Sequence, residues 1–495
     1  MKSKIFLLVL FLLATKDTTA QIMFERIYGG VDADWGVSVQ STSDSGYIAT
    51  GGSFSYGDGS NDVYLLKTDK YGNELWHKTY GGNGYDIGIA VKQTMDGGYI
   101  ITGSTSSYGA GSSDVYLIRT DALGDTLWTR TFGGAEDDAG YSVIENNDGS
   151  LLIVGNTLSF AVGFSAAYVI KTDENGNLLW QKSYEKSGTS RAGGVHKINN
   201  EGYIIAGSTY SLGTSHKMFY FLKINENGDT IWTKTYSIPN CNVGTGCVDI
   251  TADSGFVFGG SITYSNGDAD LCLMKTDTNG NFLWFKKYSG TGAQMGGNFC
   301  QTNDGCFVIT GMTGDIGKDN NTSDLITESI IFNNLNPKIE NGNLIILKTN
   351  SSGDSLWSRT YGNNNNDFGN SIQLTIDNGF IICGGKTTGS NQDLYLVKTD
   401  NLGLTGITDD YANEMNYKLY PNPSNGVFQI QSAAYCISDV KVNVMNYSGQ
   451  IILNKIIDLN ERNKIDLTTC GNGLYFIQFI YRNGETFSRK VIVQH

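Results

Sequence analysis

Short runs of alternating apolar and polar residues, separated by glycine-rich turns, fill most of this chain. The clearest stretch covers residues 76–125. It predicts strands at residues 76–82, 89–94, 99–105 and 114–121, joined by turns and loops rich in Gly, Ser and Asp. Alternating β-branched and aromatic residues bounded by Asp-Gly turns are typical of antiparallel hairpins. The pattern therefore indicates an all-β chain built from four-stranded units.

The pattern repeats, and one aromatic residue marks each copy. The marker residues are Phe24, Trp76, Trp128, Trp180, Trp232 and Trp284 at intervals of 52 residues, followed by Trp357 after 73 residues, which is one period plus 21 inserted residues. About fifty residues is the length of one four-stranded blade of a β-propeller. Seven copies therefore predict a seven-bladed β-propeller over residues 22–403.

Three further positions recur in every copy and are interpreted as structural. An aromatic residue follows the marker by four positions: Tyr28, Tyr80, Phe132, Tyr184, Tyr236, Tyr288 and Tyr361. A glycine ends the second inner strand, where the backbones approach closely: Gly51, Gly103, Gly155, Gly207, Gly259, Gly311 and Gly384. A basic residue near the end of the next strand is interpreted as a solvated strand end: Lys67, Arg119, Lys171, Lys223, Lys275, Lys348 and Lys398. We expect the marker aromatics to pack between blades.

The phase of the repeat predicts how the ring closes. The array begins with a marker-type strand at residues 24–30 and ends at Asp400 without another one. The last blade therefore has three strands of its own. We expect the N-terminal strand to supply the fourth, which would pair two otherwise exposed edges.

The N-terminus indicates export, and the net charge argues against two classes of partner. Residues 1–20 combine Lys2 and Lys4, an apolar run at 5–14 and small residues before Gln21, as in a secretory signal peptide. The apolar run is too short to span a bilayer, and no Cys follows the expected cleavage point for a lipid anchor. The net charge of −14 argues against nucleic acid and anionic lipid as partners.

Eight cysteines do not follow the repeat. Three pairs are candidate disulfides in an oxidising compartment, although spacing does not fix their connectivity: Cys241 with Cys247, Cys300 with Cys306, and Cys436 with Cys470. Without a CxxC motif, and with four scattered histidines, no zinc site is expected.

The period stops after Asp400. Residues 404–414 form a polar linker, and residues 415–495 form a separate β-rich module with an alternating apolar pattern. Roughly 80 residues of this kind predict a small β-sandwich.

Four motifs in this module resemble the type A sorting domain of the type IX secretion system. They are Tyr420-Pro421-Asn422-Pro423, then Asn446 with Gly449 and Gln450, then Leu467 with Gly473 and Tyr475, and finally Lys490 with Ile492 and Val493. The chain departs from the family pattern in ending on Gln494 and His495. The resemblance implies a Bacteroidota protein whose partner is the type IX machinery. It also implies passage across the outer membrane, followed by release or attachment to the cell surface.

One face of the propeller is the better place for a binding site. The antiparallel order puts the tight hairpins on one face and the long, variable loops, with the insertion inside 314–342, on the other. Binding sites concentrate in variable loops on a rigid scaffold. On this long-loop face, ten residues after the marker, stand Asp34, Asp86, Asp138 and Asp367, an arc over consecutive blades.

The sequence leaves three uses open for this Asp arc. Each Asp can cap its own turn, the arc can bind Ca²⁺ or a cationic ligand, or two carboxylates can catalyse glycoside hydrolysis. No other cofactor is expected. Loop aromatics lie on the same face: Tyr56, Tyr108, Phe160 and Tyr264. They either stack on sugars or fold over their own loops. The turns at 173–177 and 277–281 lack the spacing of an EF-hand and are interpreted as tight turns.

Catalytic motifs are missing from the sequence: it has no GxSxG, HExxH, phosphate loop or dinucleotide glycine motif. We therefore expect an exported binding or scaffold protein that recognises a glycan or a protein through the long-loop face. The alternative is a secreted hydrolase of polysaccharide that uses carboxylates of the Asp arc.

Overall fold

The computed structural model describes residues 22–185, 188–199, 201–211, 216–290, 292–316, 339–362, 365–389, 391–405, 417–432, 440–446, 450–457, 463–480 and 486–495. The chain divides into two compact units, Met1–Thr405 and Gly406–His495. Every element of the described residues is a β-strand, which confirms the all-β fold class. The predicted signal peptide and most of the blade-six insertion lie outside the described residues.

The described part of the first unit contains seven four-stranded antiparallel sheets, named blades 1 to 7 in chain order. Blade 1 is β2 (Asp34–Ser41), β3 (Tyr47–Ser53), β4 (Asp62–Thr68) and β5 (Glu74–Tyr80). Blade 2 is β6 (Asp86–Gln93), β7 (Tyr99–Thr105), β8 (Asp114–Thr120) and β9 (Thr126–Phe132). Blade 3 is β10 (Asp138–Glu145), β11 (Leu151–Thr157), β12 (Ala166–Thr172) and β13 (Leu178–Tyr184). Blade 4 is β14 (Gly188–Lys197), β15 (Tyr203–Ser211), β16 (Met218–Ile224) and β17 (Thr230–Tyr236).

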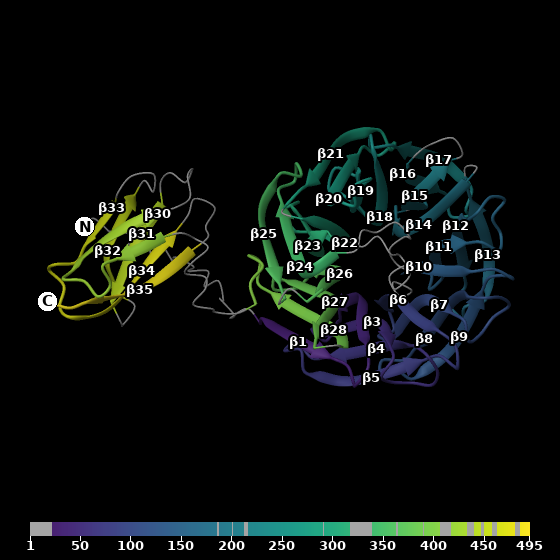
Figure 1. The fold of residues 1–495 in the computed structure, drawn as a ribbon, viewed down its shortest axis with the longest axis horizontal. Coiled ribbons are helices and arrows are strands. Elements are labelled where there is room, and N and C mark those ends of the chain that lie inside the picture. The colour runs from purple at the N-terminus through teal and green to yellow at the C-terminus, as the bar shows by residue number, and fades with distance from the viewer. Residues whose placement is uncertain are drawn as a thin grey trace, which may run out of the picture. The chain divides into compact units, whose positions relative to one another are not determined.

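The remaining three blades follow the same order. Blade 5 is β18 (Cys241–Ile250), β19 (Phe256–Tyr264), β20 (Ala269–Thr276) and β21 (Phe282–Tyr288). Blade 6 is β22 (Ala293–Gln301), β23 (Phe307–Ile316), β24 (Ile339–Thr349) and β25 (Ser355–Tyr361). Blade 7 is β26 (Phe368–Leu374), β27 (Phe380–Thr388), β28 (Asn391–Thr399) and β1 (Phe24–Tyr28). Figure 1 shows the blades arranged as a ring, with β6, β10, β14, β18, β22 and β26 toward its centre.

The N-terminal strand closes the ring, as predicted. Strand β1 pairs antiparallel with β28 from Phe24 opposite Lys398 to Tyr28 opposite Leu394. The central strand of blade 7, β26, also contacts β2 of blade 1. The first and last parts of this unit therefore share one sheet, and no outer edge of blade 7 is left without its fourth strand.

The marker aromatics act between blades, as predicted. Trp76 lies on β5 of blade 1, and its ring covers Gly124 in the outer turn of blade 2, where a Cβ would come within 2.8 Å of the indole. Four residues later, the Tyr80 hydroxyl donates a 2.6 Å hydrogen bond to the Gly124 carbonyl. Trp and Tyr thus hold the outer turn of the following blade. The same Tyr-to-Gly bond recurs for Tyr28, Tyr184, Tyr236, Tyr288 and Tyr361.

The basic residues of the third strand are not solvated strand ends, and that prediction was wrong. Six of the seven are at most 9 % exposed: Lys67, Arg119, Lys171, Lys223, Lys275 and Lys398. Each forms an ion pair with a carboxylate of a turn, such as Lys275 with Asp253 at 2.8 Å. The aliphatic stem of each side chain is buried in the sheet, and its charged group reaches the carboxylate of a turn. The sequence pattern shows only a basic residue near the end of a strand, so it does not reveal this burial.

Replacing Lys275 with methionine should destabilise the propeller unit by about 1–2 kcal/mol, because Asp253 and the buried Thr251 hydroxyl both lose a hydrogen-bond donor. The hydrogen bond from Lys275 lowers the pKa of Asp253 to about 2. This depressed pKa adds stability above the unfolded value near pH 4. The stability is lost as the pH falls toward 2, so the effect of the substitution should shrink there.

Thermal unfolding of the Lys275→Met variant at pH 7 and pH 2.5 measures this effect. Lys286→Met is the matched control, because its pair with Asp354 is open to solvent on both sides and should contribute little to stability. Equal losses in the two variants would contradict the structural role of the buried lysine.

The two disulfides that the described residues can test are not formed. Cys241 and Cys247 lie at separate positions along one strand, β18, so an extended backbone holds them apart. Cys300 and Cys306 are likewise free thiols, as is Cys470. Cys436, the expected partner of Cys470, lies outside the described residues.

The second unit is a small β-sandwich, as expected. One sheet contains β29 (Tyr417–Tyr420), β30 (Val427–Ser432) and β33 (Asn463–Asp466). The other contains β31 (Val440–Asn446), β32 (Ile451–Ile457), β34 (Gly473–Ile480) and β35 (Thr486–Val493). Phe428 and Ile465 from the first sheet and Val442, Ile477 and Val491 from the second share one buried core.

Candidate functional site

The Asp arc is buried in the structure. Asp34, Asp86, Asp138 and Asp367 are at most 1 % exposed, and none of them lines the central cavity. Asp86 shows the shared pattern. Its Oδ2 accepts hydrogen bonds from the Gly82 amide at 2.9 Å and from the Ser107 hydroxyl at 2.5 Å. Each such Asp therefore ties the connection between blades to a loop of its own blade. The four carboxylates do not converge on one ligand.

The loop aromatics mainly fold over their own blades. The Tyr56 ring stacks on Tyr64 at 5.8 Å, and its hydroxyl donates to the Gly29 carbonyl. The Tyr108 hydroxyl donates to the Gly81 carbonyl in the equivalent way. Tyr264 is held by Asp270 at 2.9 Å. These hydroxyls serve inter-blade and intra-blade contacts, and Phe160 packs on Tyr168 in the same place.

Exposed apolar side chains nevertheless gather on the long-loop face. The loop from 158 to 164 in blade 3 carries four of them: Leu158, Phe160, Val162 and Phe164. Val162 is 96 % exposed and Phe164 is 77 % exposed. Exposed apolar side chains on neighbouring positions mark surfaces used for binding. Of the four predicted aromatic residues, Phe160 belongs to this group and Tyr108 is also about half exposed.

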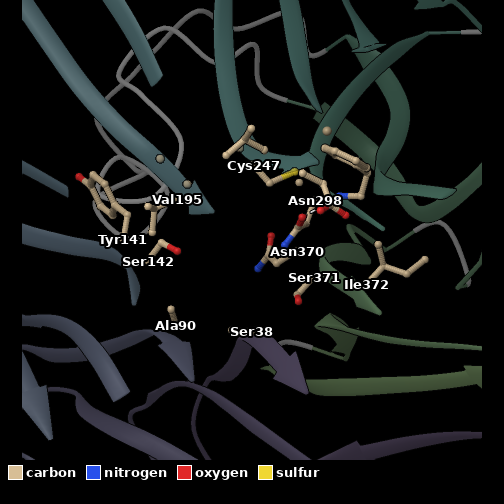
Figure 2. A pocket seen from close by; sticks show the side chains of 18 of the residues that line it. Ser38, Ala90, Tyr141, Ser142, Val195, Cys247, Asn298, Asn370, Ser371 and Ile372 are labelled. Carbon is tan, nitrogen blue, oxygen red and sulfur yellow. Dashed lines mark hydrogen bonds between the residues drawn. The ribbon is translucent and has the colours of Figure 1, made fainter. Parts of the chain in front are cut away.

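A cavity of about 550 Å³ lies along the axis of the ring. Its lining comes from the innermost strands of all seven blades. Figure 2 shows Tyr141, Ser142 and Val195 on one side, and Asn298 and Asn370 on the other. The volume lies within the range of small-ligand pockets, which combine apolar walls with a few polar groups.

The lining of this cavity mixes apolar and charged side chains. Val37, Ile89 and Tyr141 line it and pack together in one apolar cluster. Charged side chains line it as well: Lys92, Arg191, His196 and Asp249. His196 and Asp249 pair at 3.3 Å. The cavity thus contains two further cations, Lys92 and Arg191, in a protein whose net charge is −14.

Burial changes the acid–base behaviour of several groups in the cavity. Burial lowers the pKa of the Lys92 ammonium. It raises the pKa of the Cys300 thiol to about 12 and raises that of Cys247 as well. Both thiols are therefore protonated at neutral pH and are poor nucleophiles.

This cavity has only a weak signature in the sequence. Its charged residues occupy inner-strand positions that do not repeat between blades: Lys92 and His196 align with Gln40, Ile144 and Gln373. Several neighbours at these positions have structural roles. The Gln40 Oε1 accepts from the Gln93 amide, and the Gln373 Oε1 accepts from the Ser41 amide. Positions that vary within a strict repeat were the available signal.

The motifs of the second unit meet at one edge of its sandwich. Asn422 of the Tyr420-Pro421-Asn422-Pro423 motif accepts a 2.9 Å hydrogen bond from the Ile492 amide and donates to the Lys490 carbonyl. The first and last motifs are therefore joined. The Gln450 amide donates to the Asn446 side chain, and the Tyr475 hydroxyl donates to the Gly471 carbonyl beside Gly473. Gly449 lies outside the described residues.

No three His, Cys, Asp or Glu side chains among the described residues come together as a metal-binding group. The turns at 173–177 and 277–281 are tight turns, because Asp173 and Asp277 accept hydrogen bonds from amides of their own turns. Within this part of the chain, no helix is long and apolar enough to cross a membrane.

Similar solved structures cover most of the chain at low identity. A protein of unknown function from Dyadobacter fermentans is 10 % identical, with a TM-score of 0.40, over 76 % of this chain and 98 % of that one. Puromycin hydrolase is 9 % identical, with a TM-score of 0.45, over 83 % and 64 %. An α-L-arabinofuranosidase from Fusarium graminearum is 10 % identical, with a TM-score of 0.39, over 76 % and 97 %. These likenesses carry no argument about activity.

Regulatory protein FlaEY of Caulobacter vibrioides is 27 % identical over 114 residues, so the match spans 20 % of this chain and only 12 % of that curated relative.

A second sequence comparison identifies the C-terminal unit. The family described as the secretion system C-terminal sorting domain matches residues 418–494. That segment contains all four motifs of the second unit. The chain therefore carries a type IX C-terminal sorting domain, which marks it for export to the cell surface or the extracellular space.

Proposed function

We propose that this protein is an exported, non-catalytic binding protein that takes an acidic glycan in its central cavity. The observation that carries the proposal is the mixed lining of the cavity. Aromatic and apolar side chains suit the faces of sugar rings. Lys92 and Arg191 add positive charge to this lining, which would attract an acidic group.

The hydrolase alternative receives less support. Glycoside hydrolysis uses two carboxyl groups about 5–9.5 Å apart. Asp249 is the one acidic residue among the described residues that line the cavity. The carboxylates of the Asp arc are enclosed in the connections between blades. A substrate held in the cavity would therefore lack the second carboxyl group.

Binding of the purified protein to an array of neutral and acidic glycans tests this proposal. We expect retention on acidic glycans that weakens as salt is added, since exposed charges are screened. The Lys92→Ala and Arg191→Ala variants should each bind at least about 10-fold more weakly, because each loses one charge-assisted hydrogen bond.

Lys78→Ala is the matched control, because Lys78 lies on the outer strand β5 and pairs with Asp125 away from the cavity. It should bind as the wild type does. Glycan binding that survives both cavity substitutions would contradict the proposed site. Retention on protein partners alone would favour recognition through the exposed apolar loop at 158–164.

A further inference from the structure

Three junctions between neighbouring blades each bring two buried aspartates together. In each case a residue of the Asp arc meets an Asp at or near the start of the third strand of the preceding blade. The pairs are Asp393 with Asp34, Asp62 with Asp86, and Asp114 with Asp138. All six side chains are at most 9 % exposed. The junctions are consecutive around the ring: blades 7 to 1, 1 to 2 and 2 to 3.

The carboxylates of each pair approach across one glycine. At Gly133, the position of a Cβ would lie 1.9 Å from Oδ1 of Asp114 and 2.6 Å from Oδ2 of Asp138. Gly81 stands in the same relation to Asp62 and Asp86, at 1.8 and 2.6 Å. Glycine is needed here because the two carboxylates fill the space of a side chain.

These pairs leave oxygens without partners. Buried Oδ1 atoms with no hydrogen bond occur on Asp34, Asp86, Asp114, Asp138 and Asp393. No Lys, Arg or His among the described residues forms an ion pair with any of the six aspartates. Burying two carboxylates together without a counter-charge costs several kcal/mol. Each junction therefore requires a positive charge from outside the chain.

The other four junctions avoid this problem by sequence. Between blades 6 and 7, Asn343 replaces the first Asp and faces Asp367 beside Gly362. Between blades 5 and 6, the equivalent positions hold Asp270 and Gln294, and Asp270 has Lys287 at 3.5 Å. The remaining two junctions have Ala166 with Ser190, and Met218 with Asn242. Two acids therefore meet only at the three junctions whose oxygens lack partners.

We infer that each of these three junctions binds a divalent cation of the Ca²⁺ type between its two aspartates. Ca²⁺ takes six to eight oxygen ligands, and carboxylates are its preferred protein donors. In the Asp114–Asp138 pair the two Oδ1 atoms have no partners and can bind the ion, because both Oδ2 atoms already accept hydrogen bonds. Water or main-chain carbonyls would supply the other ligands. Sites of this kind in extracellular proteins bind Ca²⁺ with dissociation constants of about 10⁻⁴–10⁻³ M.

A shared proton is the competing way to neutralise such a pair. Burial, with the charge of Asp86, raises the pKa of Asp62 to about 6. At pH 7.5 most of these pairs would therefore hold no proton and would keep both negative charges. If protons alone were responsible, stability would rise as the pH falls through 6, because a carboxyl with a raised pKa binds more protons in the folded state.

Metal binding and thermal unfolding of the full chain at pH 7.5 distinguish the two. After dialysis against EGTA, we expect up to three Ca²⁺ to bind in a calcium titration. Saturating Ca²⁺ should raise the unfolding midpoint of the propeller unit by on the order of 5–10 °C. No binding at millimolar Ca²⁺, with a midpoint in EGTA that rises from pH 7 to pH 5, would overturn the inference in favour of the shared proton.

The chain offers its own control substitution, because Asn343 already faces Asp367. The Asp62→Asn, Asp114→Asn and Asp393→Asn triple variant should fold in EGTA and bind none of the three ions. Asp114→Asn alone should bind one ion fewer than the wild type, so the test survives if the triple variant does not fold. Asp137→Asn, which changes the exposed neighbour of Asp138, should keep the wild-type stoichiometry. Unchanged stoichiometry in Asp114→Asn would refute the site.

Discussion

Replacing Phe24 with alanine should destabilise the propeller unit by about 3–5 kcal/mol, the cost of removing a large aromatic side chain from a core. Phe24 is 5 % exposed, although it lies only three residues into the described chain. Its ring packs edge-on against Tyr47 at 5.9 Å and covers Gly72 of blade 1. Phe24 of blade 7 therefore covers the outer turn of blade 1, as Trp76 of blade 1 covers the outer turn of blade 2.

This effect should exceed that of an ordinary terminal substitution, because β1 is the fourth strand of blade 7. Loss of β1 would leave β28 as an open edge, which favours association with other chains. Thermal unfolding and gel filtration of Phe24→Ala check the result. Ile27→Ala is the control on the same strand, since Ile27 is 42 % exposed, and should cost less than about 1 kcal/mol. Similar midpoints for the two variants would show that β1 does not close the ring.

The parts of the fold that depend on the repeat could be predicted from the sequence. The interval between Trp76 and Trp128 fixes the length of a blade, and the missing marker strand after Asp400 fixes the closure by β1. Such features recur in every blade, so a strand pattern assigned in one copy can be checked against the other copies. The partner of each Trp, a glycine in the next blade, could not be assigned from the period alone because it is a contact between copies.

The candidate site was harder to predict, because it depends on burial and on pairs between blades. The spacing of Asp34, Asp86 and Asp138 was correct as a periodic feature, but it could not show that each carboxylate turns into a junction. Their partners, such as Asp114 for Asp138, belong to another repeat position and lie in the preceding blade. The prediction that Lys67 is a solvated strand end was wrong for a similar reason. The pattern of a strand does not show that the aliphatic stem is buried or that the ammonium pairs with Asp44.

The strict repeat and its exceptions have different roles in this molecule. Marker aromatics, turn glycines and buried lysines recur because every blade needs the same contacts with its neighbour. Lys92, Arg191 and Asp249 break the repeat and lie where the seven inner strands meet. The sorting domain accounts for export, and the irregular inner positions are the ones that we propose for ligand binding.

Replacing Gly103 with alanine should destabilise the propeller unit by about 3 kcal/mol or more, because the new Cβ would meet backbone that cannot move aside. The Cβ would stand 1.8 Å from the carbonyl oxygen of Ile87, on the adjacent inner strand of blade 2. The register between these strands shifts between Gly88 and Ala90, which presses the two backbones together. This close approach confirms the predicted reason for the repeating glycine. Another glycine, Gly97, lies in the turn of the same hairpin. Its φ is +88°, and a Cβ added there would meet open space.

Gly97→Ala separates steric contact from backbone strain, because it suffers only the strain of a left-handed backbone, about 1 kcal/mol. Chemical denaturation of both variants gives the two free energies of unfolding. The larger loss at Gly103 should recur in Gly155→Ala and Gly384→Ala, whose Cβ atoms would also come within 1.8 Å of a carbonyl oxygen. At Gly259 the cause of the loss should differ, because the added Cβ would meet the Phe299 side chain instead of a carbonyl oxygen. A ring can shift where a carbonyl in a sheet cannot, so Gly259→Ala should cost less than Gly103→Ala. The reverse order would mean that the inner strands of the ring can move apart.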